Sequence, residues 1–270
     1  MVIIVTFLIG CKGGEMAEKI TQLPKIKDIS PSSWKKLSEK KIYFGHHSVG
    51  FNIVQGIKDL LKENPQIKLR VIETHDTDEF NTYIFAHSKV GKNYDPRSKI
   101  DEFAAFMEEG IGEKVDIAFF KFCVVDIDAS TEVRRLFTDY KKKMSWLKNK
   151  YPESKFVHVT VPLIERKFTA FRSWINKLLG KKSILDDDHN IARNEFNELL
   201  RKEYDGNEPV FDLAKIESIY PDGRRAEFER NGERYYSLVP AYTHDGAHLN
   251  ETGRKKIAEQ LLIFLANLSQ

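Results

Sequence analysis

Residues 41–50 read Lys-Ile-Tyr-Phe-Gly-His-His-Ser-Val-Gly. The first four form a short apolar run that Gly45 ends, a pattern typical of a buried β-strand. Beyond this segment, apolar residues recur at helical spacing, at Ile53, Val54, Ile57, Leu60 and Leu61. The sequence therefore predicts a strand, a polar turn and a helix over residues 52–63 in immediate succession.

The same order of strand and helix repeats along the chain. Further strands are expected at 68–73, 115–125, 155–161 and 209–213, and further helices at 98–109, 131–149, 190–203 and 251–268. The run at 115–125 is rich in β-branched and aromatic residues, which suits a strand buried on both faces. This alternation predicts the α/β class, with a mostly parallel central sheet covered by helices on both faces. The pair Asn231-Gly232, within residues 224–238, predicts a small β-hairpin insertion.

Composition excludes several classes of protein. The chain has 270 residues, 41% hydrophobic and 31% charged, with a formal net charge of +3. This near-neutral balance gives no support to nucleic-acid binding, and the regular apolar runs exclude a disordered chain. Two cysteines cannot form a disulfide-rich scaffold, and Cys123, within an apolar strand, is expected to be a small core residue rather than a nucleophile. No apolar stretch reaches the roughly 18 residues of a membrane-spanning helix.

The N-terminal residues predict a signal segment at 1–11. A short apolar run ends in Leu8-Ile9-Gly10-Cys11, which resembles the lipobox of bacterial lipoproteins, where the cysteine is lipidated. The alternative is an ordinary buried first strand. Residues 12–40 are polar with two prolines and are interpreted as a tether, followed by one domain at 41–270. We therefore expect an exported bacterial lipoprotein, periplasmic or at the cell surface, that contacts the membrane only through a lipid on Cys11.

A second motif lies directly before the last helix, where residues 242–250 read Tyr-Thr-His-Asp-Gly-Ala-His-Leu-Asn. Asp245 can fix the tautomer of His248 and leave its other ring nitrogen as a base, while Asn250 is a plausible N-cap. The candidate nucleophile is Ser48, on the turn after the first strand, where open α/β sheets place their ligands. The helix that follows offers backbone N–H groups and its dipole to a developing oxyanion.

Ser48 after the first strand and Asp245-x-x-His248 before the last helix resemble the SGNH (GDSL-like) hydrolase superfamily, over roughly residues 41–268. The resemblance implies a flavodoxin-like three-layer αβα sandwich and an esterase or acyltransferase with catalytic Ser48, Asp245 and His248. It also implies backbone oxyanion donors at Ser48 and, as the best match to the family's second block, at Gly91.

The sequence departs from this family at two places. The family's G-D-S is here His46-His47-Ser48, and its G-x-N-D becomes Cys123-Val124-Val125-Asp126. Val125 thus stands where the family has its oxyanion-hole asparagine, a donor whose loss typically costs about 10² to 10³ in turnover. The nearby polar residues that could replace it or bind substrate are His46, His47 and Lys121, among which the sequence does not choose.

Simpler interpretations of the same residues stay open. Ser48 could be a helix N-cap, and His248 a histidine satisfied by structural hydrogen bonds. A metal phosphoesterase would have ligand types among His75, Asp76, Asp78, His87, His244, Asp245 and His248, but no pair of histidines has a strong metal spacing. Apolar residues within 168–179 could contact a membrane surface or line the cleft, although ordinary packing is favoured, and Lys141-Lys142-Lys143 is interpreted as a solvated helix face.

The expected function is that of a serine ester hydrolase that removes O-acetyl or other short acyl groups from a glycan. The expected partner is a small-molecule or glycan acyl ester, with no nucleic acid, no cofactor and no metal. The alternatives are an acyltransferase to a glycan hydroxyl and a non-catalytic glycan-binding surface lipoprotein.

Overall fold

A six-stranded parallel sheet forms the centre of the molecule in the computed structural model, which describes residues 22–166 and 187–270. Its strands are β1 Lys41–His46, β2 Val71–Glu73, β3 Ile84–Lys89, β4 Ile117–Phe120, β5 Lys155–Val159 and β6 Val210–Phe211, in the spatial order β2-β3-β1-β4-β5-β6. Strand β1 is central, and Tyr43 pairs with Ala86 on one side and with Ala118 on the other. The chain first builds the sheet on the β3 side of β1 and then on the β4 side, so the carboxyl end of β1 lies at the topological switch point.

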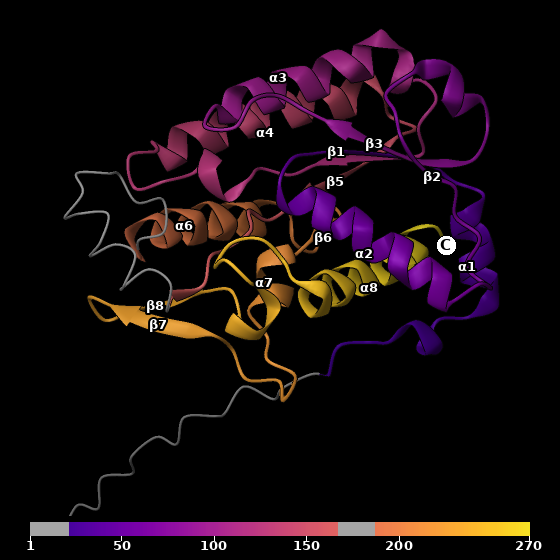
Figure 1. Ribbon diagram of the computed structural model, residues 1–270. Coiled ribbons are helices and arrows are strands. Elements are labelled where there is room, and N and C mark those ends of the chain that lie inside the picture. Colours follow the sequence, from indigo (N-terminus) through magenta and orange to yellow (C-terminus); the bar gives the residue numbers. More distant parts are fainter. Residues whose placement is uncertain (1–21, 167–186) are drawn as a thin grey trace, which may run out of the picture.

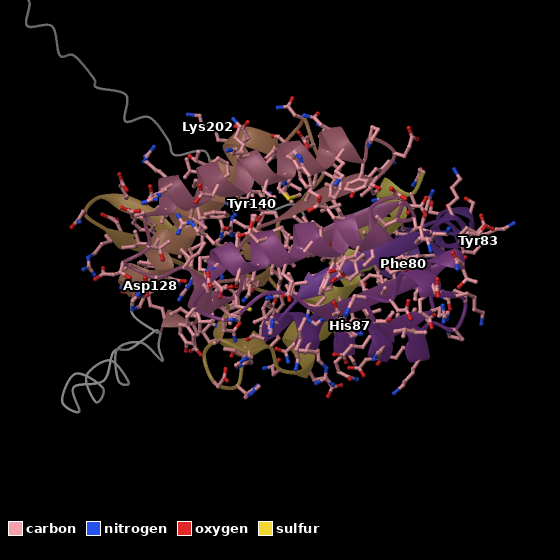
Figure 2. All side chains as sticks on the ribbon, turned by 90° about the horizontal axis from the view of Figure 1, so that it is seen from above. Phe80, Tyr83, His87, Asp128, Tyr140 and Lys202 are labelled. Carbon is pink, nitrogen blue, oxygen red and sulfur yellow. The ribbon has the colours of Figure 1, made fainter. Side chains whose placement is uncertain are left out.

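Helices cover both faces of this sheet (Figure 1). One face carries α1 Pro31–Ser38, α2 Val49–Glu63, α7 Leu213–Glu217 and α8 Glu251–Leu268, and the other carries α3 Pro96–Phe106, α4 Val133–Lys150 and α6 Asp187–Tyr204. Figure 2 views the α3 and α4 layer from above, with Tyr140 of α4 near its centre. Two apolar cores result, one on each side of the sheet, and the expected three-layer αβα sandwich is confirmed.

The predicted hairpin is also confirmed. Strands β7 Glu227–Arg230 and β8 Glu233–Tyr236 pair antiparallel around a two-residue turn. Asn231 and Gly232 have φ of 54° and 79°, the left-handed values that a type I′ turn requires and that this pair tolerates best.

Three sequence predictions differ from the structure. Strand β3 was not predicted at all, and the expected strand at 115–125 is regular only over Ile117–Phe120 before a 3₁₀ turn at Val124–Asp126. The expected tether at 12–40 is folded where it is described, because Trp34 and Leu37 of α1 are buried in the core beside α8. Helix α1 begins at an N-cap, Ser30, whose side chain accepts from the Ser33 N–H, so the polar residues there are capping residues.

Helices α2 and α8 are in close contact, and this contact brings the two motifs together. A Cβ atom at Gly56 of α2 would lie 2.3 Å from the Arg254 carbonyl oxygen and 2.9 Å from Ala258 Cβ. Only glycine therefore permits the observed approach of the two helices.

Gly56→Ala is expected to lower the free energy of unfolding by about 1–3 kcal/mol, because backbone atoms of α8 must move to admit the methyl group. Chemical denaturation measures the change. Gly206→Ala is the control: nothing lies within 4 Å of its Cβ position, and only the strain of its φ of 81° opposes alanine. A loss at Gly56 no larger than at Gly206 would contradict the close-packing argument.

Glu217, at the end of α7, is a buried carboxyl group. Burial raises its pKa to about 8, although a hydrogen bond from the Leu163 N–H and the positive charges of Lys121 and Arg193 act in the opposite direction. Between about pH 4.5 and 8 the folded protein therefore binds a proton at Glu217 that the unfolded chain has released.

The free energy of unfolding is expected to fall, through this one group, by up to about 1.4 kcal/mol per pH unit over that range. Glu217→Gln keeps the acceptor oxygen for Leu163 but cannot ionise. Its stability relative to the wild type should thus rise steadily from pH 5 to pH 8 in urea denaturation. A difference between the two proteins that does not change with pH would refute the assignment.

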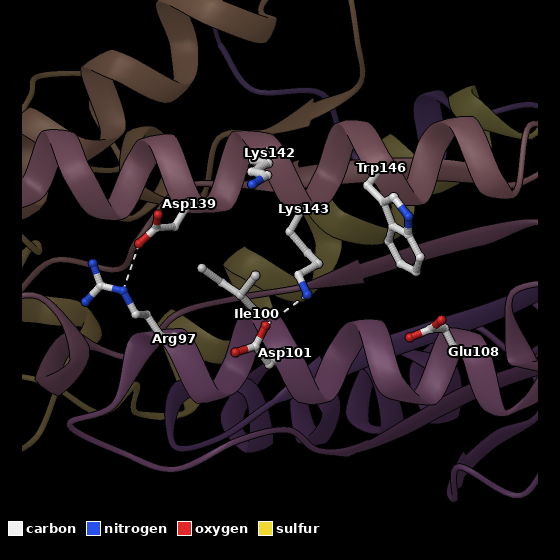
Figure 3. A pocket seen from close by; sticks show the side chains of 8 residues that line it. All are labelled: Arg97, Ile100, Asp101, Glu108, Asp139, Lys142, Lys143 and Trp146. Carbon is white, nitrogen blue, oxygen red and sulfur yellow. Dashed lines mark hydrogen bonds and ion pairs between the residues drawn. The ribbon is translucent and has the colours of Figure 1, made fainter.

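A groove of about 470 Å³ lies between α3 and α4 (Figure 3). Arg97 pairs with Asp139 at 2.8 Å and Lys143 with Asp101 at 3.0 Å, so ion pairs join the two helices across it. Lys143 therefore extends from α4 to an acidic partner on α3.

Among the helices in residues 22–166 and 187–270, none is long and apolar enough to cross a membrane.

Candidate active site

Ser48 lies on the turn between β1 and α2, at the carboxyl edge of the sheet. Its φ of 51° and ψ of −115° are strained for a residue with a side chain, and such strain is concentrated at functional sites. It is the N-cap residue of α2, yet its side chain makes no capping hydrogen bond. Within the described part of the chain, the backbone N–H groups of Ser48 and Val49 also have no hydrogen-bond partner. The serine therefore presents its hydroxyl and two amide donors at a helix N-terminus.

The Ser48 hydroxyl is joined to a histidine and an aspartate from the other end of the chain. Ser48 Oγ lies 2.9 Å from His248 Nε2, and His248 Nδ1 lies 2.7 Å from Asp245 Oδ2. Burial acts to raise the pKa of Asp245, but hydrogen bonds from the His248 ring and from the N–H groups of His248 and Ala247 lower it to about 2. The carboxylate is therefore ionised at neutral pH and holds the proton of His248 on Nδ1. Nε2 is left free to accept the Ser48 proton.

The loop that holds His248 is fixed by side chains that sequence reasoning missed. Thr243 Oγ1 donates to the His248 carbonyl oxygen at 2.7 Å and accepts from the Gly246 N–H at 2.9 Å. Asn52, one turn after Ser48 on α2, accepts from the Leu249 N–H at 3.2 Å and so ties this loop to the serine helix. Only the position of Asn52, four residues after the serine, could have indicated this role. The predicted N-cap is observed, since Asn250 accepts from the Gly253 N–H at 3.0 Å.

Two of the expected substrate-binding residues are buried, and that expectation is corrected for them. His46 has no exposed surface and contacts His87 at 3.1 Å between ring nitrogens, and burial lowers its pKa to about 2. A Cβ at Gly50 would lie 2.4 Å from the His46 ring, so the first turn of α2 rests directly on this imidazole. Lys121 is 1% exposed, and its Nζ lies 3.2 Å from the Phe122 carbonyl oxygen and 3.6 Å from Cys123 Sγ. Both side chains are therefore packed in the interior and are not accessible to a substrate.

His47 and Gly91 do come together, but not as expected. His47 Nε2 lies 2.9 Å from the Gly91 carbonyl oxygen, so His47 ties the serine turn to the loop after β3. Desolvation and the nearby Lys99 lower the pKa of His47, which favours the neutral ring in this contact. The Gly91 N–H donates to the Glu102 carboxylate. In this structure the Gly91 amide is thus directed to α3 and not to the Ser48 hydroxyl, and its role as an oxyanion donor stays a prediction.

An open pocket has Val125 and Asp126 in its lining, on the 3₁₀ turn after β4. Val125 packs against a small apolar cluster that includes Ala247, the residue before His248. From Val125 the pocket extends past Tyr94, Asp128 and Ser130, with a volume of about 410 Å³. Tyr94 is 68% exposed and offers an aromatic ring at its rim. Val125 therefore contacts the apolar cluster beside His248 and also lines the polar pocket.

The remaining candidate residues from the sequence have the following places in the structure. No cluster of three or more metal-ligand side chains occurs in residues 22–166 and 187–270. Cys123 is fully buried, as expected of a core residue. Lys141 and Lys143 pair with Glu203 and Asp101, which agrees with a solvated helix face. Cys11 and the apolar segment 168–179 lie outside the described residues.

Comparison with known proteins identifies the fold. No family model matches the sequence, and neither does any curated protein sequence. Among solved structures, a protein from Parabacteroides merdae named as a GDSL-like lipase superposes with a TM-score of 0.53 and 14% identity, over 86% of this chain and 97% of that one. A lipase/acylhydrolase from Enterococcus faecalis gives 0.49 and 13%, over 85% and 96%. The first superposition, with a TM-score above 0.5, shows that the chain has the fold of the GDSL-like, or SGNH, hydrolases and is divergent in sequence.

Proposed function

We propose that this protein is a serine ester hydrolase that removes short acyl groups, acetyl above all, from a glycan. The proposal rests on the hydrogen-bonded chain from Ser48 Oγ to His248 Nε2 and from His248 Nδ1 to Asp245 Oδ2. A serine that served only as a helix cap would bond its own helix, whereas Ser48 bonds a base 200 residues away. This geometry matches the nucleophile, general base and orienting carboxylate of acyl transfer.

The reaction follows from these positions. Ser48 Oγ attacks the carbonyl carbon of the ester and gives its proton to His248 Nε2. As the bond from this carbon to the alcohol oxygen breaks, the imidazolium protonates the leaving alkoxide. Water, activated by the same nitrogen, then attacks the acyl-enzyme and releases the acid and Ser48. Asp245 stabilises the imidazolium throughout, and the Ser48 N–H is directed to the developing oxyanion.

The polar pocket beside Val125 supports a polar alcohol rather than a long acyl chain. Its lining includes Asp128, Ser130 and Thr131, which can bond hydroxyl groups, and the exposed ring of Tyr94 is suited to the face of a sugar. A volume of about 410 Å³ accommodates one or two sugar rings. The lipobox-like segment at Cys11 adds the proposal that the protein is exported and acts on glycans outside the cytoplasm.

The experiment combines a covalent serine probe with a substrate panel. The purified protein should be labelled by a fluorophosphonate, with the adduct on the peptide that contains Ser48. It should release acetate from acetylated xylan and cleave p-nitrophenyl acetate faster than the octanoate. No labelling and no ester cleavage above background would contradict the enzymatic proposal. Acyl transfer from p-nitrophenyl acetate to an added oligosaccharide, in place of hydrolysis, would identify an acyltransferase.

A further inference from the structure

The loop after β3, residues 91–95, is bonded to the serine turn through Gly91 and His47, and two oxyanion donors that the family resemblance implies are missing around it. Val125 removes the family's side-chain donor, and Glu102 engages the Gly91 N–H. The other amides of this loop are also taken: Lys92 N–H donates to Ser98, Tyr94 N–H to Asp126, and Asp95 N–H to the Lys92 carbonyl oxygen. Asn93 is the exception, since neither its backbone N–H nor its Nδ2 has a partner within residues 22–166 and 187–270.

The position of Asn93 is bracketed by contacts on both sides. Two residues before it, Gly91 bonds His47, the neighbour of Ser48. One residue after it, Tyr94 donates at 3.1 Å to Asp126, the neighbour of Val125. Asn93 therefore lies between the nucleophile turn and the turn from which the family's asparagine would reach the oxyanion.

A buried lysine fixes the orientation of the Asn93 side-chain amide. Lys99 Nζ donates to Asn93 Oδ1 at 2.9 Å and to Asp126 Oδ2 at 2.7 Å. The side chains of Lys99 and Asp126 are 1% and 0% exposed, so this is a buried ion pair. Separating such a pair would leave a buried charge without a partner, so the two side chains are held in place. Here Lys99 holds the exposed amide by its oxygen, and its NH₂ group has no partner within residues 22–166 and 187–270, as a fixed hydrogen-bond donor requires.

We propose that Asn93 Nδ2 is the side-chain oxyanion donor of this enzyme, in place of the asparagine that Val125 replaces. The inference rests on the proposed function. Nδ2 donates a hydrogen bond to the carbonyl oxygen as attack by Ser48 makes it negative, together with the Ser48 N–H. Lys99 and Asp126 are positioning residues, which act through Asn93 and do not touch the substrate.

The test measures kcat, KM and the rate of fluorophosphonate labelling for Asn93→Ala and Asn93→Asp with p-nitrophenyl acetate. Both variants should lower kcat by about 10² to 10³ and leave KM within about threefold. The labelling rate should fall in parallel, because the phosphonyl oxygen occupies the same position as the oxyanion. Asn93→Asp keeps the shape and the contact with Lys99, so it tests the donor even where alanine disturbs the loop.

Asn81→Ala is the matched control. Asn81 Oδ1 also accepts from a lysine, Lys114, at 3.2 Å, but it lies at the opposite edge of the sheet, before β3. Its kcat should equal that of the wild type. If Asn93→Ala and Asn93→Asp keep kcat within threefold while Ser48→Ala is inactive, the inference fails and the proposed function stands. If the wild type shows no activity or labelling that depends on Ser48, both fail.

Discussion

Replacing Ser48 by alanine is expected to lower kcat for p-nitrophenyl acetate by about 10⁴ to 10⁶ and to abolish fluorophosphonate labelling. The substitution removes the nucleophilic oxygen that lies 2.9 Å from His248 Nε2. It does not remove a helix cap, since the Ser48 side chain makes no capping bond. The melting temperature should therefore stay close to that of the wild type, which separates loss of chemistry from loss of fold.

The double variant Ser48→Ala/His248→Ala makes this prediction sharper. Because the nucleophile and its base act as one unit, the double variant should be no slower than Ser48→Ala alone. His244→Ala is the control: its ring is 63% exposed and lies 3.9 Å from the Asp245 carboxylate, without a bond to Ser48. It should retain full activity. More than a tenth of the wild-type rate in Ser48→Ala would show that another group is the nucleophile.

That Ser48, Asp245 and His248 come together could be predicted from sequence because the signals are local. The strand before Ser48, the helix pattern after it and the three-residue spacing of Asp245 and His248 are each readable within a few residues. Their order along the chain then requires an α/β domain that joins its two ends. In the structure, the contact of α2 with α8 at Gly56 joins the two ends. Nothing in the sequence around Gly56 indicated this helix contact.

The supporting groups could not be predicted, because polarity in a sequence does not reveal burial. Histidine and lysine are ordinarily surface residues, but His46 is buried against His87 of β3, and Lys121 is buried with its ammonium group on Phe122 and Cys123. Strand β3 was missed for a related reason. Its residues include His87 and Ser88, which read as polar in sequence but are buried between β1 and β2 in the sheet. The role proposed for Asn93 likewise depends on a contact between residues far apart in sequence, because Lys99 bonds both Asn93 and Asp126.

Asp245→Asn is expected to lower kcat by about 10³ to 10⁴ with little change in the fold. In the wild type, Oδ1 accepts the N–H groups of Ala247 and His248 at 3.0 and 2.7 Å, whereas Oδ2 alone bonds the ring at 2.7 Å. An asparagine can keep its oxygen at the first position and so preserve the loop. Its NH₂ group then replaces Oδ2 and donates to His248 Nδ1.

That reversal moves the His248 proton to Nε2, the nitrogen that must accept the proton of Ser48, and it also removes the charge that stabilises the imidazolium. The KM for p-nitrophenyl acetate should change little, because Asp245 does not touch the ester. The pKa of Asp245 is about 2, so the wild-type carboxylate stays ionised between pH 5 and 9 and the deficit should persist across this whole range. Steady-state kinetics at each pH provide the measurement.

Asp76→Asn is the control, since Asp76 Oδ1 accepts from the Asp78 N–H at 3.0 Å in a similar turn without a histidine partner. A fall of less than tenfold in Asp245→Asn would mean that His248 is oriented by its loop alone, and that Ser48 and His248 act as a dyad.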